Sequence, residues 1–366
     1  MQGIMRELRK QGFQVKQKFA VPNHQYRTAQ GLFSKLCVRI KAYILYPAML
    51  AWQIVFREKE QAINVVCTNT FYAPLLAAIC SRKKPVIHLL YDVYPDALEC
   101  AGYLKPHSAL SRFIAAVTHR TLHVCDANVL LGKHLKKHVE NRYGEVRTPW
   151  VIPVGADDSL FTKFQKRTEC ERIEFLYCGH LGRMHNTQTL STALLAQDRE
   201  WLLRSHFRFY ASGPNYEPLQ KQLHLLTQNQ TALLDFGYSI PDEDWLDIME
   251  EADVGIVTMA PGAEKIVMPS KAYSAIAAGQ AILAICPRDS DLADLVNAHD
   301  CGWVVEPGDI ERLRETIAEI VNDKKQLLRK RRNAWQAGHG EYSSKALAQK
   351  WRNLFEQVLS HSTTLL

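Results

Sequence analysis

Little in this sequence could cross a membrane or hold a structural metal. The apolar stretch 33–56 has an uncharged run of only 15 residues, 42–56, whereas a membrane-spanning helix needs about 20. The nine cysteines are scattered and form no C-x-x-C pair, which argues against a structural zinc site and indicates buried thiols in a reducing compartment. The N-terminus is polar and basic, without the apolar core of a secretory signal. These absences predict a cytoplasmic protein without a membrane span.

The sequence also lacks the patterns of nucleic-acid binders and of repeat proteins. It has no zinc finger, basic zipper or ribonucleoprotein-type aromatic motif, and no repeat at solenoid periods. Its net charge of +7 is unevenly divided, because residues 1–150 hold 22 Lys and Arg against 9 Asp and Glu, whereas the remainder holds 23 against 29. A basic half predicts an anionic partner, and without nucleic-acid motifs a membrane surface or a phosphorylated substrate is favoured over nucleic acid.

Short apolar runs alternate with amphipathic segments along the whole chain. In the first half, strands are predicted at 13–21, 63–68, 85–91, 127–131 and 150–154, and helices at 2–12, 73–81, 108–122 and 133–142. In the second half, strands are predicted at 173–178, 207–211, 233–236, 254–258 and 281–286, and helices at 187–196, 216–226, 242–251, 269–279, 310–322, 324–335 and 344–359. Strands that alternate with helices indicate parallel sheets covered by helices on both faces.

The polar, aperiodic segment 157–172 divides these elements into two sets. We therefore predict an α/β fold of two doubly wound, Rossmann-like domains, 1–156 and 173–343, joined by a linker and facing across a cleft at the carboxyl ends of their strands. The terminal helix 344–360 is expected to pack back on the first domain. Such a sheet usually opens with its central strand and a glycine-rich turn, whereas this chain opens in what reads as the following helix. The first sheet is therefore expected to lack its usual opening strand, through truncation, a wrongly assigned start or an unusual construction.

Two interpretations suit the stretch 33–56, which is rich in Leu, Ile, Tyr and Trp with Lys35, Arg39 and Lys41 interleaved. One is a helix that packs on a sheet. The other is a helix that lies in the interface of a membrane. The sequence leaves both open.

The passage 261–279 predicts a short helix with an unusual start. Pro269 and Ser270 favour the start and the cap of a helix, and Gly279 favours its end. Lys271 is then a cation in the first turn, where it opposes the macrodipole at a cost of roughly 0.3–1 kcal/mol. A bound phosphate would turn that cost into a gain, because free N–H groups and Lys271 would converge on it. A solvated lysine is the alternative.

An ordered set of blocks resembles the retaining glycosyltransferases of family 4, which have the two-domain GT-B fold. The blocks are WVIPVGAD at 150–157, IEFLYCGHLGRMH at 173–185, FRFYASGP at 207–214, DFGYSIP at 235–241, ADVG at 252–255 and DCGWVVEPGD at 300–309. Two further blocks, LYDVYPDA at 90–97 and MPSK at 268–271, are similar to the subgroup that builds bacterial exopolysaccharide and O-antigen units.

The resemblance implies transfer of a hexose or acetamido-hexose from a nucleotide-diphosphate sugar, for which UDP is the favoured nucleotide. The acceptor would be a lipid-linked or saccharide molecule in surface-polysaccharide synthesis. The resemblance implies acceptor binding in 1–156, donor binding in 173–343, no cofactor and no bound metal.

A lipid-linked acceptor would place the basic first domain on an anionic membrane surface, at the inner face of the cell membrane. Each nearby cation adds about 1 kcal/mol there, and the cations considered are Lys35, Arg39, Lys41 and the turn Arg82-Lys83-Lys84. A merely basic soluble domain is the alternative.

The resemblance assigns the departing diphosphate to Arg183 and Lys271. Preorganised cations stabilise such a leaving group without a change of protonation. Gly182 would let the backbone approach the phosphate closely, and Ser270 stands beside Lys271 in the same block. His185 is considered as a further phosphate donor.

The family usually carries two glutamates eight positions apart, the first near the donor sugar and the second on the ribose. Glu264 is in reasonable register for the first. The second position carries Ser274, which departs from the pattern: its hydroxyl could bond a ribose without charge, or it could be a serine that merely faces its helix.

Asp92 and Glu264 are the two candidate catalytic carboxylates. Asp92 follows a predicted strand and is the candidate contact for the acceptor. The family often has a histidine just before this position, but here it is Tyr91, so no histidine role is carried over. His88 lies within the strand and is predicted to be a core histidine. The proton of the acceptor hydroxyl would pass to the leaving phosphate or to Asp92.

Two other functions are weighed against transfer. A non-catalytic or impaired glycosyltransferase-like subunit is suggested by the missing opening strand and by Ser274. A nucleotide-sugar 2-epimerase on the same fold would need further carboxylates and histidines around the sugar, which these blocks do not suggest.

Overall fold

Ten short strands form two parallel sheets in the computed structural model, which describes residues 1–18, 31–56, 62–68, 70–81, 84–165, 172–228, 233–238, 240–241 and 243–363. The chain divides into two compact units. One joins Met1–Glu7 to Pro153–Ala348, and the other joins Leu8–Ile152 to Gln349–Leu366. The α/β class and the parallel sheets predicted from the alternation are confirmed.

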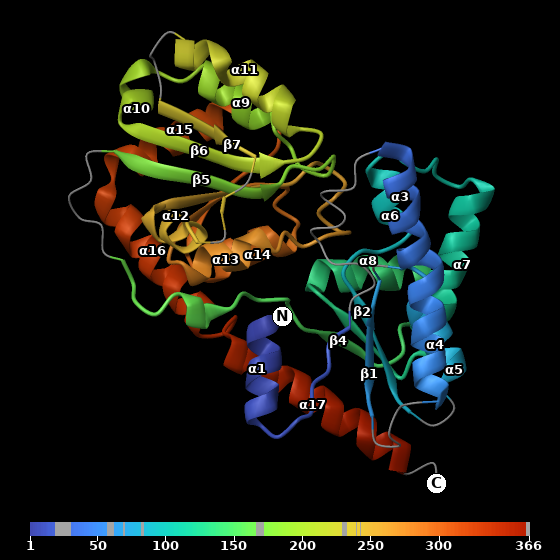
Figure 1. The fold of residues 1–366 in the computed structure, drawn as a ribbon. Coiled ribbons are helices and arrows are strands. Elements are labelled where there is room, and N and C mark those ends of the chain that lie inside the picture. Colours follow the sequence, from blue (N-terminus) through green and yellow to red (C-terminus); the bar gives the residue numbers. More distant parts are fainter. Residues whose placement is uncertain are drawn as a thin grey trace. The chain divides into compact units, whose positions relative to one another are not determined.

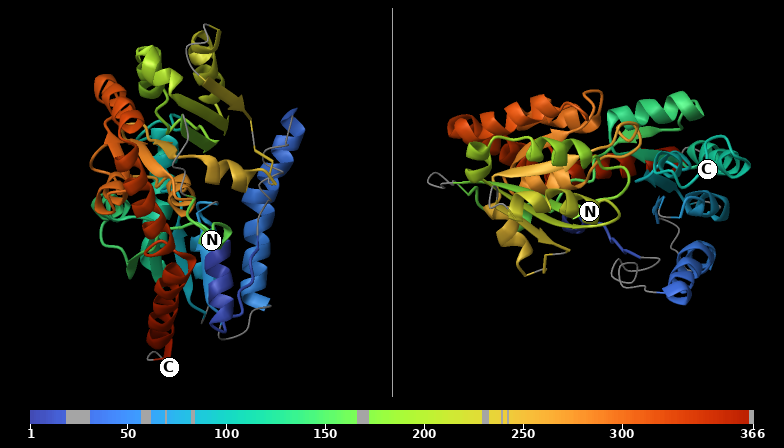
Figure 2. Two further views of the ribbon diagram at one scale, coloured as in Figure 1. Left: turned by 90° about the vertical axis from the view of Figure 1, so that its left-hand side faces the viewer. Right: turned by 90° about the horizontal axis from the view of Figure 1, so that it is seen from above.

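The unit that contains Leu8–Ile152 has a four-stranded parallel sheet in the order β1-β2-β3-β4. Its strands are β1 (Asn64–Cys67), β2 (Val86–Leu90), β3 (Ala127–Leu130) and β4 (Pro149–Val151). Its helices are α3 (Gly31–Ile40), a π-helical turn (Lys41–Leu45), α4 (Tyr46–Phe56), α5 (Ala73–Cys80), α6 (Asp96–Cys100), α7 (Ala109–Val124) and α8 (Lys133–Tyr143). Figure 2 shows α3, the π-helical turn and α4 as one continuous helical rod.

The unit that contains Pro153–Ala348 has a six-stranded parallel sheet in the order β10-β9-β8-β5-β6-β7. Its strands are β5 (Ile173–His180), β6 (Ser205–Ser212), β7 (Leu233–Gly237), β8 (Val254–Thr258), β9 (Ala281–Ile285) and β10 (Gly302–Val305). Its helices are α9 (Gln188–Leu195), α10 (Arg199–Leu203), α11 (Tyr216–Gln228), α12 (Trp245–Glu251), α13 (Lys271–Ala277), α14 (Asp291–Ala298), α15 (Ile310–Asn322) and α16 (Lys324–His339), with a 3-10 turn at Asp158–Leu160. Helices α9, α10, α11 and α15 cover one face, and α13 and α16 lie on the other (Figure 1).

The order of the six-stranded sheet places the strands with the most continuous apolar runs in its middle. Every residue of β8 and β9 is buried, as expected for central strands of a sheet that is covered on both faces. On the neighbouring strands, the rings of Phe175 and Phe207 stack with their centroids 4.5 Å apart. This core fixes where the carboxyl ends of β5 and β8 lie, and the candidate site is built on those ends.

A buried arginine ties α16 to the rest of this unit. Arg331 is 1% exposed; its Nη1 donates to Oδ1 of Asp253 at 2.8 Å, its Nε to the carbonyl of Gly279 at 3.1 Å and its Nη2 to the carbonyl of Gln165 at 3.0 Å. The other carboxylate oxygen of Asp253 accepts a hydrogen bond from the backbone of Glu174 at 3.0 Å. One side chain therefore joins α16, the end of α13, the start of β8 and the segment after residue 157.

The two ends of the chain are helical. Helix α1 (Gln2–Lys10) matches the prediction for 2–12, and Arg6 on it pairs with Asp157 at 2.6 Å. Helix α17 (Ser344–Thr363) ends the described chain, and the ring of Phe355 packs against that of Phe13 with centroids 5.6 Å apart.

The predicted strand at 13–21 is wrong for its described part, because residues 13–18 form no strand. This segment finds no neighbouring strand to pair with; instead Nη2 of Arg9 donates to the carbonyl of Val15. Within the described ranges no strand precedes β1. Helices α6, α10 and α14 and strand β10 were not predicted, since four to eight residues are too few for a clear period. None of the helices that the structure describes is long and apolar enough to cross a membrane.

Candidate functional site

The loop that follows β5 holds Gly182 and Arg183 in a fixed turn. The side-chain amide of Asn215 donates to the carbonyls of Gly182 and His185 at 3.0 and 3.1 Å, and the backbone of Leu181 donates to that of Ser212. A Cβ on Gly182 would lie 3.1 Å from the ring of His180, so a larger residue there would have to displace that ring by a few tenths of an ångström. Arg183 is exposed on this loop.

Lys271 reaches the same loop from another element. It is the first residue of α13, and its Nζ donates to Oη of Tyr177 and, at 3.2 Å, to the carbonyl of His180. The Nζ lies 4.1 Å from the centroid of the Tyr177 ring, a cation–π geometry. The structure thus brings Lys271 next to the turn that carries Gly182 and Arg183, although almost ninety residues separate them in sequence.

The ammonium of Lys271 has no carboxylate partner among the residues that the structure describes. Burial lowers the pKa of Lys271 to about 7, because a buried charge without an anion is poorly compensated. Burial also raises the pKa of Tyr177. A partly buried cation that lacks an anion is suited to receive an anionic ligand.

His185 lies two residues after Arg183, but its ring is uncharged at pH 7. Its Nδ1 lies 3.0 Å from the carbonyl oxygen of Thr258. Burial and the neighbouring Lys271 lower the pKa of His185 to about 4, so its ring is neutral at pH 7. This geometry argues against His185 as a cationic contact for a phosphate.

The cap that the sequence predicted for α13 is not formed. Ser270 occupies the N-cap position and is exposed, but its side chain makes no capping hydrogen bond. Its φ of −61° and ψ of −24° are helical, whereas a capping serine has an extended backbone that directs its hydroxyl to the helix N–H groups. The helix ends as predicted at Gly279, whose φ is +76°.

Glu264 and Ser274 flank Lys271 in sequence without bonding to it. Glu264 lies on the loop after β8, where Oε2 accepts a hydrogen bond from the backbone of Gly262 at 2.6 Å. That loop is tied to the loop after β5, because the backbone of Ala260 donates to the carbonyl of Met184 at 2.8 Å. Ser274 is partly buried one turn into α13. Glu264 thus lies on a loop that is tied to the loop of Gly182 and Arg183, but its carboxylate bonds the backbone of Gly262 and not Lys271.

Asp92 belongs to the other unit, directly after β2. The backbone N–H groups of Tyr91 and Asp92 both donate to Oγ1 of Thr68 at 3.1 Å. Burial raises the pKa of the Asp92 carboxyl, and no described residue donates a hydrogen bond to it.

His88 is buried, with Nδ1 3.0 Å from Oδ1 of Asn128, and burial lowers its pKa to about 4. The prediction of a core histidine is confirmed.

Residue-by-residue reasoning missed a buried carboxylate four positions after Asp92. Asp96 is 2% exposed and is bound by Nε2 of His138 at 2.6 Å, by Oη of Tyr143 and by Nη1 of Arg142 at 3.2 Å. Burial alone would raise the pKa of Asp96, but these hydrogen bonds and the charge of Arg142 lower it. This network holds the turn that carries Asp92. The signals in the sequence were the place of Asp96 after Pro95 and its membership of the block LYDVYPDA at 90–97.

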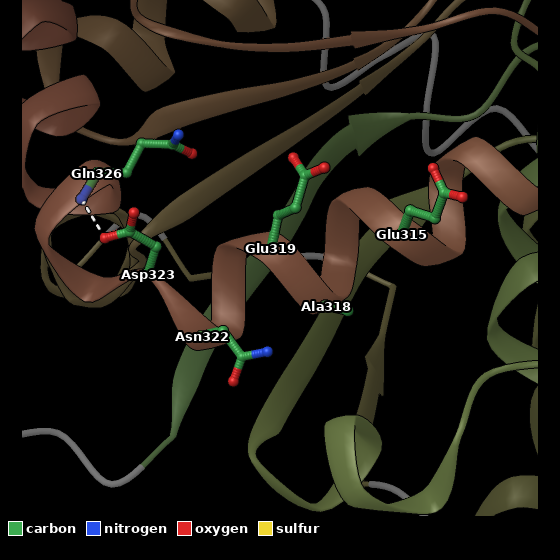
Figure 3. A pocket seen from close by; sticks show the side chains of 6 residues that line it. All are labelled: Glu315, Ala318, Glu319, Asn322, Asp323 and Gln326. Carbon is green, nitrogen blue, oxygen red and sulfur yellow. Dashed lines mark hydrogen bonds between the residues drawn. The ribbon is translucent and has the colours of Figure 1, made fainter.

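Neither a metal cluster nor a pocket among the described residues adds to the group formed by Gly182, Arg183 and Lys271. Among the described residues, no three His, Cys, Asp or Glu side chains gather to hold a metal ion. Figure 3 shows a shallow pocket on α15 and α16, lined by Glu315, Ala318, Glu319, Asn322, Asp323 and Gln326. None of the predicted site residues lines it.

Comparison with known proteins points to one family. Residues 159–337 match the family described as Glycosyl transferases group 1. The probable glycosyltransferase WbjE of Pseudomonas aeruginosa is 26% identical over 267 residues, which cover 70% of this chain and 65% of that protein. The chain therefore spans just under two thirds of this relative. The matched segment and the relative support a glycosyltransferase enzyme.

Solved structures with the same fold include two proteins at low sequence identity. The sucrose-phosphate synthase of Thermosynechococcus elongatus superposes with a TM-score of 0.66 at 14% identity, over 93% of this chain and 81% of that one. HepE of Anabaena in complex with UDP superposes with a TM-score of 0.64 at 14% identity, over 90% and 85%. The likeness confirms the predicted GT-B fold of two parallel-sheet domains.

Proposed function

We propose that the chain is a retaining glycosyltransferase of family 4 that moves a hexose or acetamido-hexose from a nucleotide-diphosphate sugar, UDP being the favoured nucleotide. The acceptor is a lipid-linked or saccharide molecule in surface-polysaccharide synthesis. One observation carries the proposal: Lys271 Nζ binds the carbonyl of His180 in the loop of Gly182 and Arg183, inside the segment that matches the group 1 family. HepE, which shares the fold, was solved with UDP and with UDP-glucose.

The diphosphate is assigned to the group around Lys271. Its ammonium and the exposed Arg183 supply positive charge, the backbone at Gly182 lets a phosphate approach closely, and the hydroxyl of Ser270 is uncommitted as a cap. When the bond between the anomeric carbon and the diphosphate breaks, negative charge grows on the leaving phosphate. Fixed cations stabilise that charge without moving a proton.

The sugar and the ribose are assigned to Glu264 and Ser274. Glu264 stands on a loop that is anchored to Met184, so its carboxylate can reach a sugar hydroxyl beside the diphosphate. Ser274 offers a neutral hydroxyl on the helix that Lys271 opens. A hydroxyl binds a ribose more weakly than a carboxylate does, and this difference predicts a modest affinity for the nucleoside.

The acceptor is assigned to the domain 1–156, with Asp92 as its contact. A buried carboxylate whose pKa is raised is a better proton acceptor than a solvated one. As the acceptor oxygen bonds to the anomeric carbon, its proton passes to the leaving phosphate or to Asp92. A lipid-linked acceptor places this domain at the inner face of the cell membrane, as a peripheral protein.

The nucleotide is tested by thermal unfolding. We expect UDP and UDP-sugars to raise Tm, and adenosine and guanosine diphosphates to raise it less. A ligand at 100 times its Kd adds about 2.7 kcal/mol, and each kcal/mol raises Tm by roughly 2–4 °C for a domain of about 150–250 residues. Release of free sugar from the donor by purified protein separates a catalyst from an inactive subunit. If no nucleoside diphosphate shifts Tm, the assignment of the donor site is wrong.

The affinity for UDP is expected to fall as the pH rises above 7. Burial holds the pKa of Lys271 at about 7 in the free protein, and a diphosphate binds the charged form. Affinity should therefore weaken by up to tenfold for each pH unit between pH 7 and 9, as measured by titration calorimetry. Lys271→Arg keeps its charge over this range and should bind UDP independently of pH. If the affinity for UDP depends on pH in the same way in the variant and the parent, Lys271 does not bind the phosphate.

A further inference from the structure

The helical rod formed by α3, the π-helical turn and α4 is firmly attached along its inner side. Its inward residues Val38, Ala42, Pro47 and Ile54 are buried. Oγ1 of Thr70 donates to the carbonyl of Ala42 at 2.9 Å, and Nζ of Lys84 donates to that of Ile54 at 3.0 Å. These contacts make the rod a fixed part of the unit that contains Leu8–Ile152.

The outer face of the rod is apolar and open. Ten large apolar side chains between residues 33 and 56 are exposed. Among them are Ile44 at 61%, Leu45 at 55%, Trp52 at 46% and Phe56 at 72% exposure. Single exposed apolar residues are ordinary, but a contiguous row of this length on a soluble protein marks a surface for a partner.

The charges of the rod indicate the chemistry of that partner. Residues 31–56 contain Lys35, Arg39 and Lys41 but no Asp or Glu, and Arg39 and Lys41 are exposed. Two copies of the rod packed face to face would bring like charges together. An anionic surface instead pairs with them, and Tyr43 and Trp52 are of the residue types that favour the boundary between headgroups and acyl chains.

We propose that this outer face lies in the plane of an anionic bilayer, with its apolar side chains among the upper acyl chains and Arg39 and Lys41 among the headgroups. An amphipathic helix in this position is buried by roughly 5–10 Å. The inference deepens the membrane association proposed above by naming the surface. Of the turn first considered for this role, Arg82 and Lys83 lie outside the described residues, and Lys84 bonds the rod itself.

Flotation with vesicles tests the surface without donor or acceptor, so that its failure leaves the transferase proposal untouched. We expect the full chain to bind phosphatidylcholine vesicles containing about 30% phosphatidylglycerol at low salt at least tenfold more tightly than pure phosphatidylcholine vesicles. Arg39→Gln with Lys41→Gln should weaken that binding by about fivefold for each charge. Ile44→Ser with Leu45→Ser should weaken it by at least tenfold. Lys221→Gln with Leu225→Ser, an exposed pair on α11, is the matched control and should bind as the parent does.

Depth is measured by quenching of tryptophan fluorescence with brominated lipids. We expect quenching in the parent that is mostly lost in Trp52→Phe, because Trp52 lies on the outer face. Equal affinity for neutral and anionic vesicles, or unchanged binding by both rod variants, would overturn the proposal. Concentration-dependent dimerisation abolished by Ile44→Ser with Leu45→Ser, in a chain that does not bind vesicles, would assign the face to a second copy instead.

Discussion

Lys271→Ala is expected to lower kcat/KM for glycosyl transfer by roughly 10²- to 10³-fold or more, the usual effect of removing one preorganised group that stabilises developing charge. Lys271 is the residue whose ammonium stands beside the loop of Gly182 and Arg183, and no carboxylate in the described part of the chain pairs with it. An alanine leaves the loop in place, because Asn215 still holds it. The measurement is the initial rate of sugar transfer, together with the Kd for UDP.

The fold should survive this substitution. The folded pKa of Lys271, about 7, lies below the ordinary lysine pKa of 10.5, so the unfolded state binds more protons between these two pH values. By linkage, burial of Lys271 destabilises the folded state below pH 7, and that cost disappears as the pH rises toward 10.5. The Tm of Lys271→Ala at pH 7 should therefore equal or exceed that of the parent.

Lys265→Ala is the matched control for this prediction. Lys265 lies on the loop between β8 and α13, which leads to Lys271; it is about half exposed and pairs with Asp289 at 3.6 Å. Such exposed pairs contribute little, so its rate should change by less than about twofold. Loss of activity in both variants, or retention of activity in Lys271→Ala, would contradict the assignment of the diphosphate to Lys271.

Arg331→Ala is expected to cost about 3–5 kcal/mol of unfolding free energy, because it removes the buried guanidinium that pairs with the buried carboxylate of Asp253 at 2.8 Å. It also removes donors to the carbonyls of Gln165 and Gly279. The unfolding free energy, measured by urea denaturation followed by circular dichroism, should fall by this amount. If the unit no longer folds at 25 °C, stabilisation by UDP gives a second measurement.

The same helix offers a control for that substitution. Arg329 is 61% exposed and pairs with Asp300 at 3.2 Å, so Arg329→Ala should cost no more than about 1 kcal/mol. Arg331→Met with Asp253→Asn removes both charges of the buried pair together and should cost less than Arg331→Ala alone, since the carboxylate is removed along with the guanidinium. Equal costs for Arg329→Ala and Arg331→Ala would show that the buried pair does not stabilise the unit.

Local sequence patterns were sufficient for most of the fold. The alternation of apolar runs with amphipathic segments predicted both parallel sheets, because strands such as β8 and β9 consist almost entirely of apolar residues and are buried on both faces. The prediction of a strand at 13–21 was wrong because its described part, residues 13–18, pairs with no described strand. An alternating pattern marks a strand only where a neighbour completes its hydrogen bonds, and residues 13–18 have none.

The features of the candidate site were likewise predicted from the sequence where they are local and decided by the tertiary structure where they are not. The sequence by itself determined that Lys271 opens a helix, that Gly279 ends it and that Gly182 and Arg183 lie in a loop after a strand, because turns, helix ends and periodicity are local. Only the tertiary structure decided that Lys271 reaches Tyr177 and His180, that Arg331 is the buried partner of Asp253 and that the rod 31–56 is attached on one side and open on the other. These are contacts between residues far apart in the chain, set by the order of strands in a sheet and by which helix faces find a partner, and no local pattern encodes either.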